Sequence, residues 1–270
     1  MGIAGVHHQS GLPFVPQIED IPQFALGQIE SVGYVVWCDG TGEAVIVDPG
    51  AATDQMLSAV AEWASPVAAV LLTHAHLDHV EGLGLVRDYT DAPIYLHAED
   101  RPLLDALPAQ AAMFGLTVPE VPPPDEELSD GDHFRFGEST FEVVHTPGHS
   151  PGHVILRAVE DGFVLVGDLV FAGSIGRTDL PGGDYRALFE SIRKHVLTLP
   201  DDTRLYSGHG PETTVGHERI GNPFLIHMEG ERSEKAVAHR QRSGLTAFRG
   251  VVRSASPACA SNHVSRSISG

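Results

Sequence analysis

Cysteine is scarce in this 270-residue chain, in which Cys38 and Cys259 are the only two. Two cysteines exclude the disulfide framework of small secreted proteins, and they exclude a zinc site built from cysteine thiolates. Long apolar runs are also missing, since no segment approaches the roughly 20 apolar residues that span a bilayer. The first eight residues lack a basic region followed by an apolar stretch. We therefore expect a cytoplasmic protein without a membrane segment.

Basic residues are in short supply over most of the chain. The sequence has 17 Lys and Arg against 36 Asp and Glu, for a formal charge of −19. From residue 227 onward seven basic residues stand against three acidic ones, so residues 1–226 carry 10 basic and 33 acidic side chains. Nucleic-acid binding requires clustered Lys and Arg to neutralise phosphates. The acidic balance therefore predicts that nucleic acid is not a partner.

Patterning divides the chain into three parts. Residues 1–19 contain Pro, Gly and His and predict a loose N-terminal arm. Residues 20–227 alternate apolar runs with turn residues and predict the folded domain. From 228 to 270 the apolar periodicity is lost and the sequence becomes rich in Ser and Ala, which predicts a partly disordered tail.

A dense group of histidines follows an apolar run over residues 67–72. Residues 73–79 read Thr-His-Ala-His-Leu-Asp-His, with three imidazoles and a carboxylate in six consecutive positions. Neutral His and ionised Asp together suit a divalent ion better than they suit a core. Because α/β sheets keep their sites at the carboxyl ends of strands, this position indicates a metal site on an α/β scaffold.

The remaining pattern predicts strands followed by helices, twice over. Two apolar runs separated by an Asp-Gly turn are typical of a β-hairpin. Apolar residues that recur every three or four positions are typical of one face of a helix. Two such αβ halves would pack sheet to sheet between outer helices. The expected strands are 32–37, 44–47, 67–72, 93–96, 134–145 (a hairpin turning at 137–139), 153–158, 163–167 and 204–206. The expected helices are 53–64, 79–88, 98–114 and 184–198, and 118–127 is expected to be a loop.

Three further strand ends carry His or Asp beside glycine, where a small neighbour lets a ligand approach closely. They are the ends at Gly148-His149, Gly167-Asp168 and Gly208-His209. Together with the first group they supply more ligands than one tetrahedral ion accepts, and they suit two ions that share a bridging carboxylate and hydroxide. The predicted metal ligands are His74, His76, Asp78, His79, His149, Asp168 and His209.

The order of these motifs resembles the metallo-β-lactamase superfamily. The chain has His-x-His-x-Asp-His, then Gly-His, Gly-Asp and Gly-His, over residues of roughly 20–225. The resemblance implies a four-layer αβ/βα sandwich. It also implies a first metal held by His74, His76 and His149, a second held by Asp78, His79 and His209, and Asp168 as the bridge.

Three other residues are assigned from the motifs. Asp48 and His153 are predicted to hydrogen-bond or pack against ligand residues rather than to bind metal, because metal-bound histidines are held by such partners. Arg177 is the candidate anion clamp for a substrate carboxylate, since its planar fork pairs bidentately. The alternative for Arg177 is a structural salt bridge to Asp179 or Asp184.

The segments Gly173–Asp184, Gly208–Arg219 and Asn222–Phe224 are similar to those of short bacterial glyoxalase II-like hydrolases. That resemblance implies hydrolysis of acylated glutathione thioesters such as S-lactoylglutathione. The longer glyoxalase II enzymes carry a C-terminal helical domain that supplies basic residues for glutathione, and the roughly 46 residues after Phe224 are too few for it. Another small thiol is therefore an alternative carrier.

The expected reaction is attack of a metal-bridging hydroxide on the thioester carbonyl, with Asp78 and Asp168 as the catalytic carboxylates. The two divalent ions are expected to be zinc, with iron and manganese also compatible with His/Asp ligands. One alternative is a mono-iron persulfide dioxygenase, a relative that shares the Gly-Arg-Thr-Asp stretch but tends to have Cys in place of His153. A lactonase or β-lactamase is a second. A binding module with a structural metal is a third, although structural sites close with four ligands.

Overall fold

The computed structural model describes residues 23–26, 31–113, 115–117, 121–158 and 161–226. The arm predicted over 1–19 and the tail predicted over 228–270 lie outside these residues. All described residues belong to one compact unit. No helix among them is long and apolar enough to cross a membrane.

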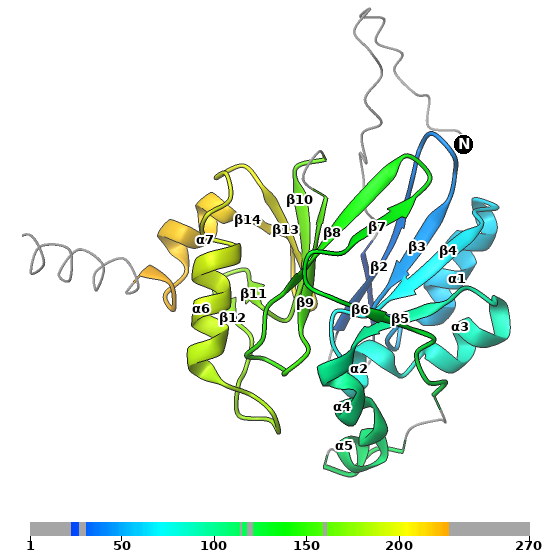
Figure 1. The fold of residues 1–270 in the computed structure, drawn as a ribbon, viewed down its shortest axis with the longest axis horizontal. Helices are drawn as coiled ribbons and strands as arrows, with labels where there is room; N and C mark the ends of the chain where they lie inside the picture. The colour runs from blue at the N-terminus through cyan, green and yellow to red at the C-terminus, as the bar shows by residue number, and fades with distance from the viewer. Residues whose placement is uncertain (1–22, 27–30, 114, 118–120, 159–160, 227–270) are drawn as a thin grey trace, which may run out of the picture. The chain divides into compact units, whose positions relative to one another are not determined.

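The first sheet has six strands in sequence order, with β2 and β3 antiparallel and β3 to β6 parallel (Figure 1). Apolar runs split by the turn at 38–43 form the predicted β2–β3 hairpin. The strands are β1 (Gln23–Leu26), β2 (Ser31–Trp37), β3 (Ala44–Val47), β4 (Val67–Leu71), β5 (Ile94–His97) and β6 (Glu126–Leu128).

The second sheet also has six strands, in the order β14-β13-β10-β9-β8-β7, and only β10 and β13 run parallel. The strands are β7 (His133–Phe136), β8 (Ser139–His145), β9 (Val154–Ala158), β10 (Phe163–Gly167), β13 (Arg204–Ser207) and β14 (Thr213–Thr214). A separate two-stranded sheet pairs β11 (Val170–Phe171) with β12 (Ser174–Ile175).

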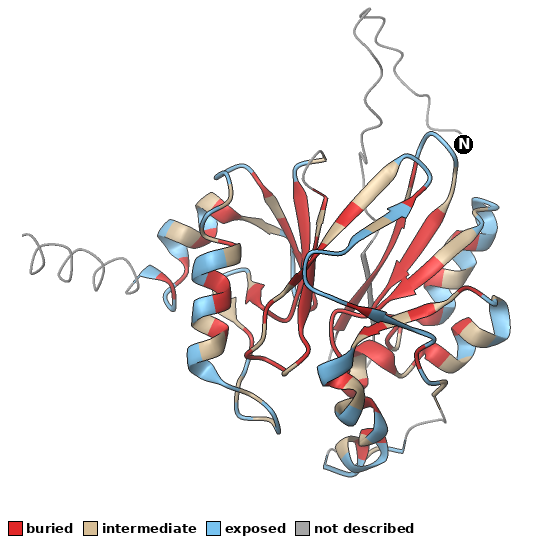
Figure 2. Ribbon diagram, viewed as in Figure 1, coloured by how far each residue is buried: buried red, intermediate tan, exposed pale blue. Residues whose placement is uncertain are grey.

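Helices lie against the outer face of each sheet, so that the buried residues form the interior of the sandwich (Figures 1 and 2). One apolar cluster joins the facing sides of the two sheets, with Val36 and Val45 packed against Phe141 and Phe163. The helices are α1 (Thr53–Glu62), α2 (Leu77–Val80), α3 (Leu83–Tyr89), the 3-10 turn η1 (Ala98–Asp100), α4 (Arg101–Asp105), α5 (Leu107–Met113), α6 (Tyr185–His195) and α7 (Val215–Gly221). The predicted αβ/βα sandwich is confirmed.

Two predicted helices are wrong as continuous elements. The helix expected over 79–88 divides into α2 and α3 at Gly82, whose N–H donates to the Pro49 carbonyl at 2.9 Å. A Cβ on Gly82 would lie 1.9 Å from Thr53 Oγ1, so only glycine fits this contact. The helix expected over 98–114 divides into η1, α4 and α5, and Pro108 explains the last break because proline cannot continue a helix interior.

Short elements were missed by the sequence patterns. The loop predicted over 118–127 contains the start of β6, whose Glu-Glu-Leu sequence has little strand propensity but pairs with β5. The strands β1, β11, β12 and β14 and the helix α7 were not predicted either. Elements of two to seven residues carry too few side chains to show a period.

Candidate metal centre

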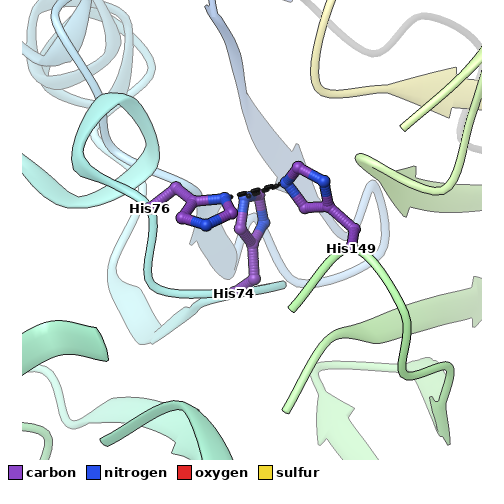
Figure 3. Close-up of side chains that lie close together, drawn as sticks. All are labelled: His74, His76 and His149. Carbon is purple, nitrogen blue, oxygen red and sulfur yellow. Dashed lines mark hydrogen bonds between the residues drawn. The ribbon is translucent and has the colours of Figure 1, made fainter. Parts of the chain in front are cut away.

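Three imidazoles form the first cluster, which consists of His74, His76 and His149 (Figure 3). His74 and His76 follow β4, and His149 lies in the loop between β8 and β9. His149 Nε2 lies 2.8 Å from His76 Nδ1 and 3.2 Å from His74 Nε2. All three residues are buried. Two loops that are distant in sequence therefore bring three ring nitrogens to one place.

The electrostatics of the first cluster favour neutral rings. Burial holds the pKa of His74 well below its usual value and lowers the pKa of His76 to about 3, and the neighbouring imidazoles act in the same direction. Neutral imidazole is the form that binds metals. Converging neutral nitrogens of this kind fit a divalent cation.

The second cluster consists of Asp78, His79 and His209. Asp78 and His79 lie on α2, and His209 follows β13. Asp78 Oδ2 lies 3.6 Å from His79 Nε2 and 3.3 Å from His209 Nε2. The His79 side chain is buried, whereas those of Asp78 and His209 are 15% and 25% exposed. This cluster therefore has a side that opens to solvent.

Asp168 lies between the two clusters, at the end of β10. Its Oδ2 is 3.3 Å from His149 Nε2 and 3.3 Å from His209 Nε2. Its Oδ1 is 3.4 Å from His79 Nε2, but neither of these two buried atoms has a hydrogen-bond partner among the described residues. Buried polar atoms without hydrogen-bond partners destabilise a folded protein. These two atoms face one space, where a bound cation would supply the missing partner.

Charge in the second cluster is shared between carboxylates and imidazoles. Burial would lower the pKa of His79, but Asp78 and Asp168 raise it well above its usual value. The same carboxylates raise the pKa of His209 to about 10 against the effect of its burial. Burial would raise the pKa of Asp78 and Asp168, yet His79 holds both below their usual values. A divalent cation could take the place of the imidazole protons.

Asp48 contacts two of the predicted ligands or their neighbours through hydrogen bonds. Its Oδ1 accepts the Thr73 backbone N–H at 2.7 Å and its Oδ2 accepts the Thr73 hydroxyl at 2.6 Å. Asp48 Oδ2 also lies 3.1 Å from His79 Nδ1, which leaves His79 Nε2 for the cluster. Asp48, His74 and His79 form a third group close enough together to hold a metal ion. The hydrogen bonds described above already occupy the two Asp48 oxygens.

His153 makes contacts through both ring nitrogens. Its Nε2 accepts the Asp168 backbone N–H at 3.1 Å, and its Nδ1 lies 2.9 Å from Thr146 Oγ1. Neither nitrogen is then left for a metal. His153 is thereby placed to hold the backbone of Asp168, and a supporting role for it stays a prediction.

Arg177 contacts the first cluster through its backbone rather than its side chain. Its carbonyl lies 2.8 Å from His149 Nδ1 and accepts that N–H, which leaves His149 Nε2 facing the cluster. Its guanidinium makes two contacts of 2.8 Å with Asp179, and both side chains are more than half exposed. The salt bridge that was the alternative is present, and a role in substrate binding stays a prediction.

Asp100 and Gln110 organise the ligand loops and were missed by sequence reasoning. Asp100, fully buried, accepts the Ala75 N–H at 2.9 Å, the Ser150 hydroxyl at 2.7 Å and the Gly152 N–H at 2.6 Å. It thus joins the two loops of the first cluster. Gln110 bonds to the backbone at Ala75 and Leu77. An isolated Asp or Gln gives no signal in a sequence, because its partners are distant.

Gly208 shows why glycine precedes a ligand here. A Cβ at this position would lie 2.2 Å from Asp168 Oδ1 and 2.6 Å from His79 Cε1. Any side chain would therefore displace the bridging position or a ligand ring.

A family model described as the Metallo-beta-lactamase superfamily matches residues 27–209. The chain belongs to this superfamily. It is 38% identical over 210 residues to hydroxyacylglutathione hydrolase GloC of Haemophilus influenzae, a match that covers 77% of this chain and 97% of that protein. It is 39% identical over 203 residues to the probable metallo-hydrolase YqgX of Bacillus subtilis, covering 74% and 94%. Accordingly, the chain is a metallo-hydrolase of this superfamily.

Solved structures give the same family. The BLEG-1 B3 metallo-beta-lactamase is 40% identical with a TM-score of 0.72, and the match covers 76% of this chain and 99% of that one. TTHA1623 in a di-iron-bound form is 41% identical with a TM-score of 0.69, covering 75% and 99%. ETHE1 from Myxococcus xanthus is 26% identical with a TM-score of 0.62, covering 76% and 83%. The His/Asp cluster suits divalent ions. The names of the relatives differ in the activity or the metal that they state.

Proposed function

We propose that this protein is a dinuclear metal hydrolase that cleaves thioesters of a small thiol. The observation that carries the proposal is the position of Asp168. One of its oxygens is 3.3 Å from a nitrogen of each cluster, as a carboxylate shared by two ions requires. A structural metal would need only one closed set of four ligands.

The residues divide the work of binding two ions. His74, His76 and His149 would hold the first ion, Asp78, His79 and His209 the second, and Asp168 would bridge them. When bound, two divalent ions would supply a hydroxide at neutral pH, because such ions lower the pKa of bound water toward ~7, and would polarise the carbonyl of the substrate. Zinc is the expected metal, and the di-iron form of TTHA1623 makes iron the alternative to test.

The chain's own residues orient the reactants. Asp78 lies on the open side of the second cluster, where its carboxylate can accept a hydrogen bond from the attacking water. His79 is held by Asp48, and His149 is held by the Arg177 carbonyl, so two ligand rings are fixed before substrate arrives. A thiolate is a good leaving group, and the site needs no strong general acid.

The substrate class rests on the relatives and on one side chain. GloC is named a hydroxyacylglutathione hydrolase, and its match to this chain covers nearly the whole length of GloC. Arg177 is more than half exposed beside the first cluster, where its fork could bind a carboxylate of the thiol carrier after exchange with Asp179.

The test combines metal analysis with substrate hydrolysis on the purified full-length chain. We expect two ions per chain, and release of free thiol from S-lactoylglutathione measured with a thiol reagent. The same assay with a thioester of an uncharged thiol shows whether the protein recognises the acyl group or the thiol carrier. One iron per chain, no hydrolysis and oxygen uptake with glutathione persulfide would overturn the proposal.

Lactones and β-lactams are the second group of substrates to assay. The similarity to BLEG-1, named a B3 metallo-beta-lactamase, favours including them. Two ions with turnover of a β-lactam and none of a thioester would retain the dinuclear centre and replace the substrate class.

A further inference from the structure

A short segment of chain borders both clusters at once. The segment from β11 to Arg177, residues 170–177, begins two residues after the bridging Asp168. The Phe171 ring meets the His209 ring edge to face at 5.6 Å between centroids. At its other end, the Arg177 carbonyl accepts the His149 N–H at 2.8 Å. The position of this segment therefore restrains one ligand ring in each cluster.

Two side chains from α7 and its C-terminal end hold the turn of this segment. Glu218 Oε2 accepts the Gly173 backbone N–H at 2.9 Å. Asn222 Nδ2 donates to the Ser174 carbonyl at 2.8 Å and to Glu218 Oε2 at 2.8 Å. Glu218 Oε1 accepts the Thr213 hydroxyl at 2.6 Å. The Gly173 N–H and the Ser174 carbonyl, at the turn between β11 and β12, are thus bonded to side chains of α7 and its C-terminal cap.

Both side chains of this arrangement are buried. Glu218 and Asn222 have no exposed surface, and Glu218 has no ion pair among those found in the described residues. Its carboxylate is held by neutral donors alone. A buried carboxylate without a cation is tolerated only when its hydrogen bonds are complete, and such a network is rigid.

We propose that Glu218 and Asn222 are positioning residues for the metal centre. They fix the turn at Gly173 and Ser174, and through Phe171 and the Arg177 carbonyl they fix the rings of His209 and His149. The proposal rests on the two-ion centre proposed above, but it does not depend on the identity of the substrate. Metal affinity, rather than folding alone, is the quantity that these residues set.

The test is a zinc titration of the metal-free protein against a chromophoric chelator, with the melting temperature recorded for each variant. Glu218→Gln retains the size of the side chain but presents an amide N–H₂ where Glu218 accepts hydrogen bonds. We expect zinc to bind about 10-fold less tightly at both clusters, the low end of the range found when a partner of a metal ligand is lost. Asn222→Ala removes the bond to Ser174 only and is expected to act in the same direction.

The matched control lies on the same helix. Arg219 donates to the Leu197 and Leu199 carbonyls at 2.9 and 3.0 Å, on elements away from the 170–177 segment. Arg219→Gln should lower the melting temperature and leave both zinc affinities within twofold of the wild-type values. Were Glu218→Gln and Asn222→Ala to behave like this control, the two residues would be structural and the proposal would be overturned.

Phe171→Leu supplies a variant that folds if Glu218→Gln does not. Its side chain is only partly buried, and its loss should weaken zinc binding through His209 directly. At the second cluster, a double variant of Phe171→Leu with Asn222→Ala should bind zinc no more weakly than the worse single variant, since there both act on the His209 ring. Full additivity would contradict the route through Phe171.

Failure of the proposed function is a separate result. Two zinc ions without thioester hydrolysis would remove the substrate assignment and leave the titrations to decide the role of Glu218. A wild-type chain that binds fewer than two zinc ions would overturn both.

Discussion

The two clusters differ in burial and in charge, although they share a bridging residue. The first is made of three buried imidazoles, and burial lowers the pKa of His74 and His76, so these two rings carry no charge. The second adds a carboxylate, raises the pKa of its histidines and is partly exposed at Asp78 and His209. A neutral, closed site holds an ion firmly in place, while a charged, open one leaves room for water and substrate.

Asp168→Asn breaks the comparison most severely, because the bridging carboxylate serves both clusters. We expect hydrolysis to fall on the order of 10³-fold, since residues that act as a unit at a reaction centre have effects of this size or larger. Metal analysis should show fewer than two ions. Circular dichroism checks that the chain remains folded, and full activity with two ions retained would refute the bridging role.

Lowering the pH should weaken metal binding at the second cluster more than at the first. The pKa of His209 is raised to about 10, so below that pH the metal-free second cluster carries a proton that a metal must displace. The lowered pKa of His76, about 3, leaves that ring of the first cluster already neutral above pH 3. Affinity at the second cluster should therefore fall about 10-fold per pH unit for each proton displaced, and affinity at the first should hardly change.

Calorimetric zinc titrations in buffers of different ionisation enthalpy measure this proton release directly. We expect the tighter binding step to release few protons and the weaker step to release more. Equal proton release in both steps would show that the two clusters do not differ in charge as described.

Asp48→Asn sharpens the comparison within the second cluster. The amide can still accept from Thr73, but it no longer presents a carboxylate to His79 Nδ1. Loss of such a partner weakens metal binding by about 10-fold, and the second ion should be the one affected. Unchanged binding of both ions would mean that packing alone orients His79.

Asp179→Asn should have the smallest effect. It removes the carboxylate that occupies the Arg177 fork, an exposed pair of the kind that contributes little to stability. We expect KM for an anionic thioester to fall by about two- to fivefold, the range set by exposed ion pairs, with a neutral thioester unaffected. Arg177→Gln should raise KM for the anionic substrate alone. Equal changes for both substrates would exclude Arg177 as an anion clamp.

The predicted ligands can be recognised in the sequence, whereas the residues that hold the ligand loops cannot. The seven predicted ligands follow strand ends and carry their chemistry in their residue types, and the structure brings them all within the two clusters and their bridge. Asp100 and Glu218 are single acidic residues in an acidic chain. The partners of Asp100 lie 25 to 52 positions away and those of Glu218 lie 4 to 45 positions away. Such contacts leave no local pattern.

The amino-acid sequence by itself determined the class of fold and named the residues of the candidate metal centre, because hydrophobic period and residue type are local properties. Only the tertiary structure decided how far apart the predicted ligands lie and which cluster opens to solvent. These features depend on Thr73 bonding to Val154 and Gly208 to Val32, contacts that join the two sheets at the site. They arise from packing two halves of the chain together, which no stretch of residues specifies alone.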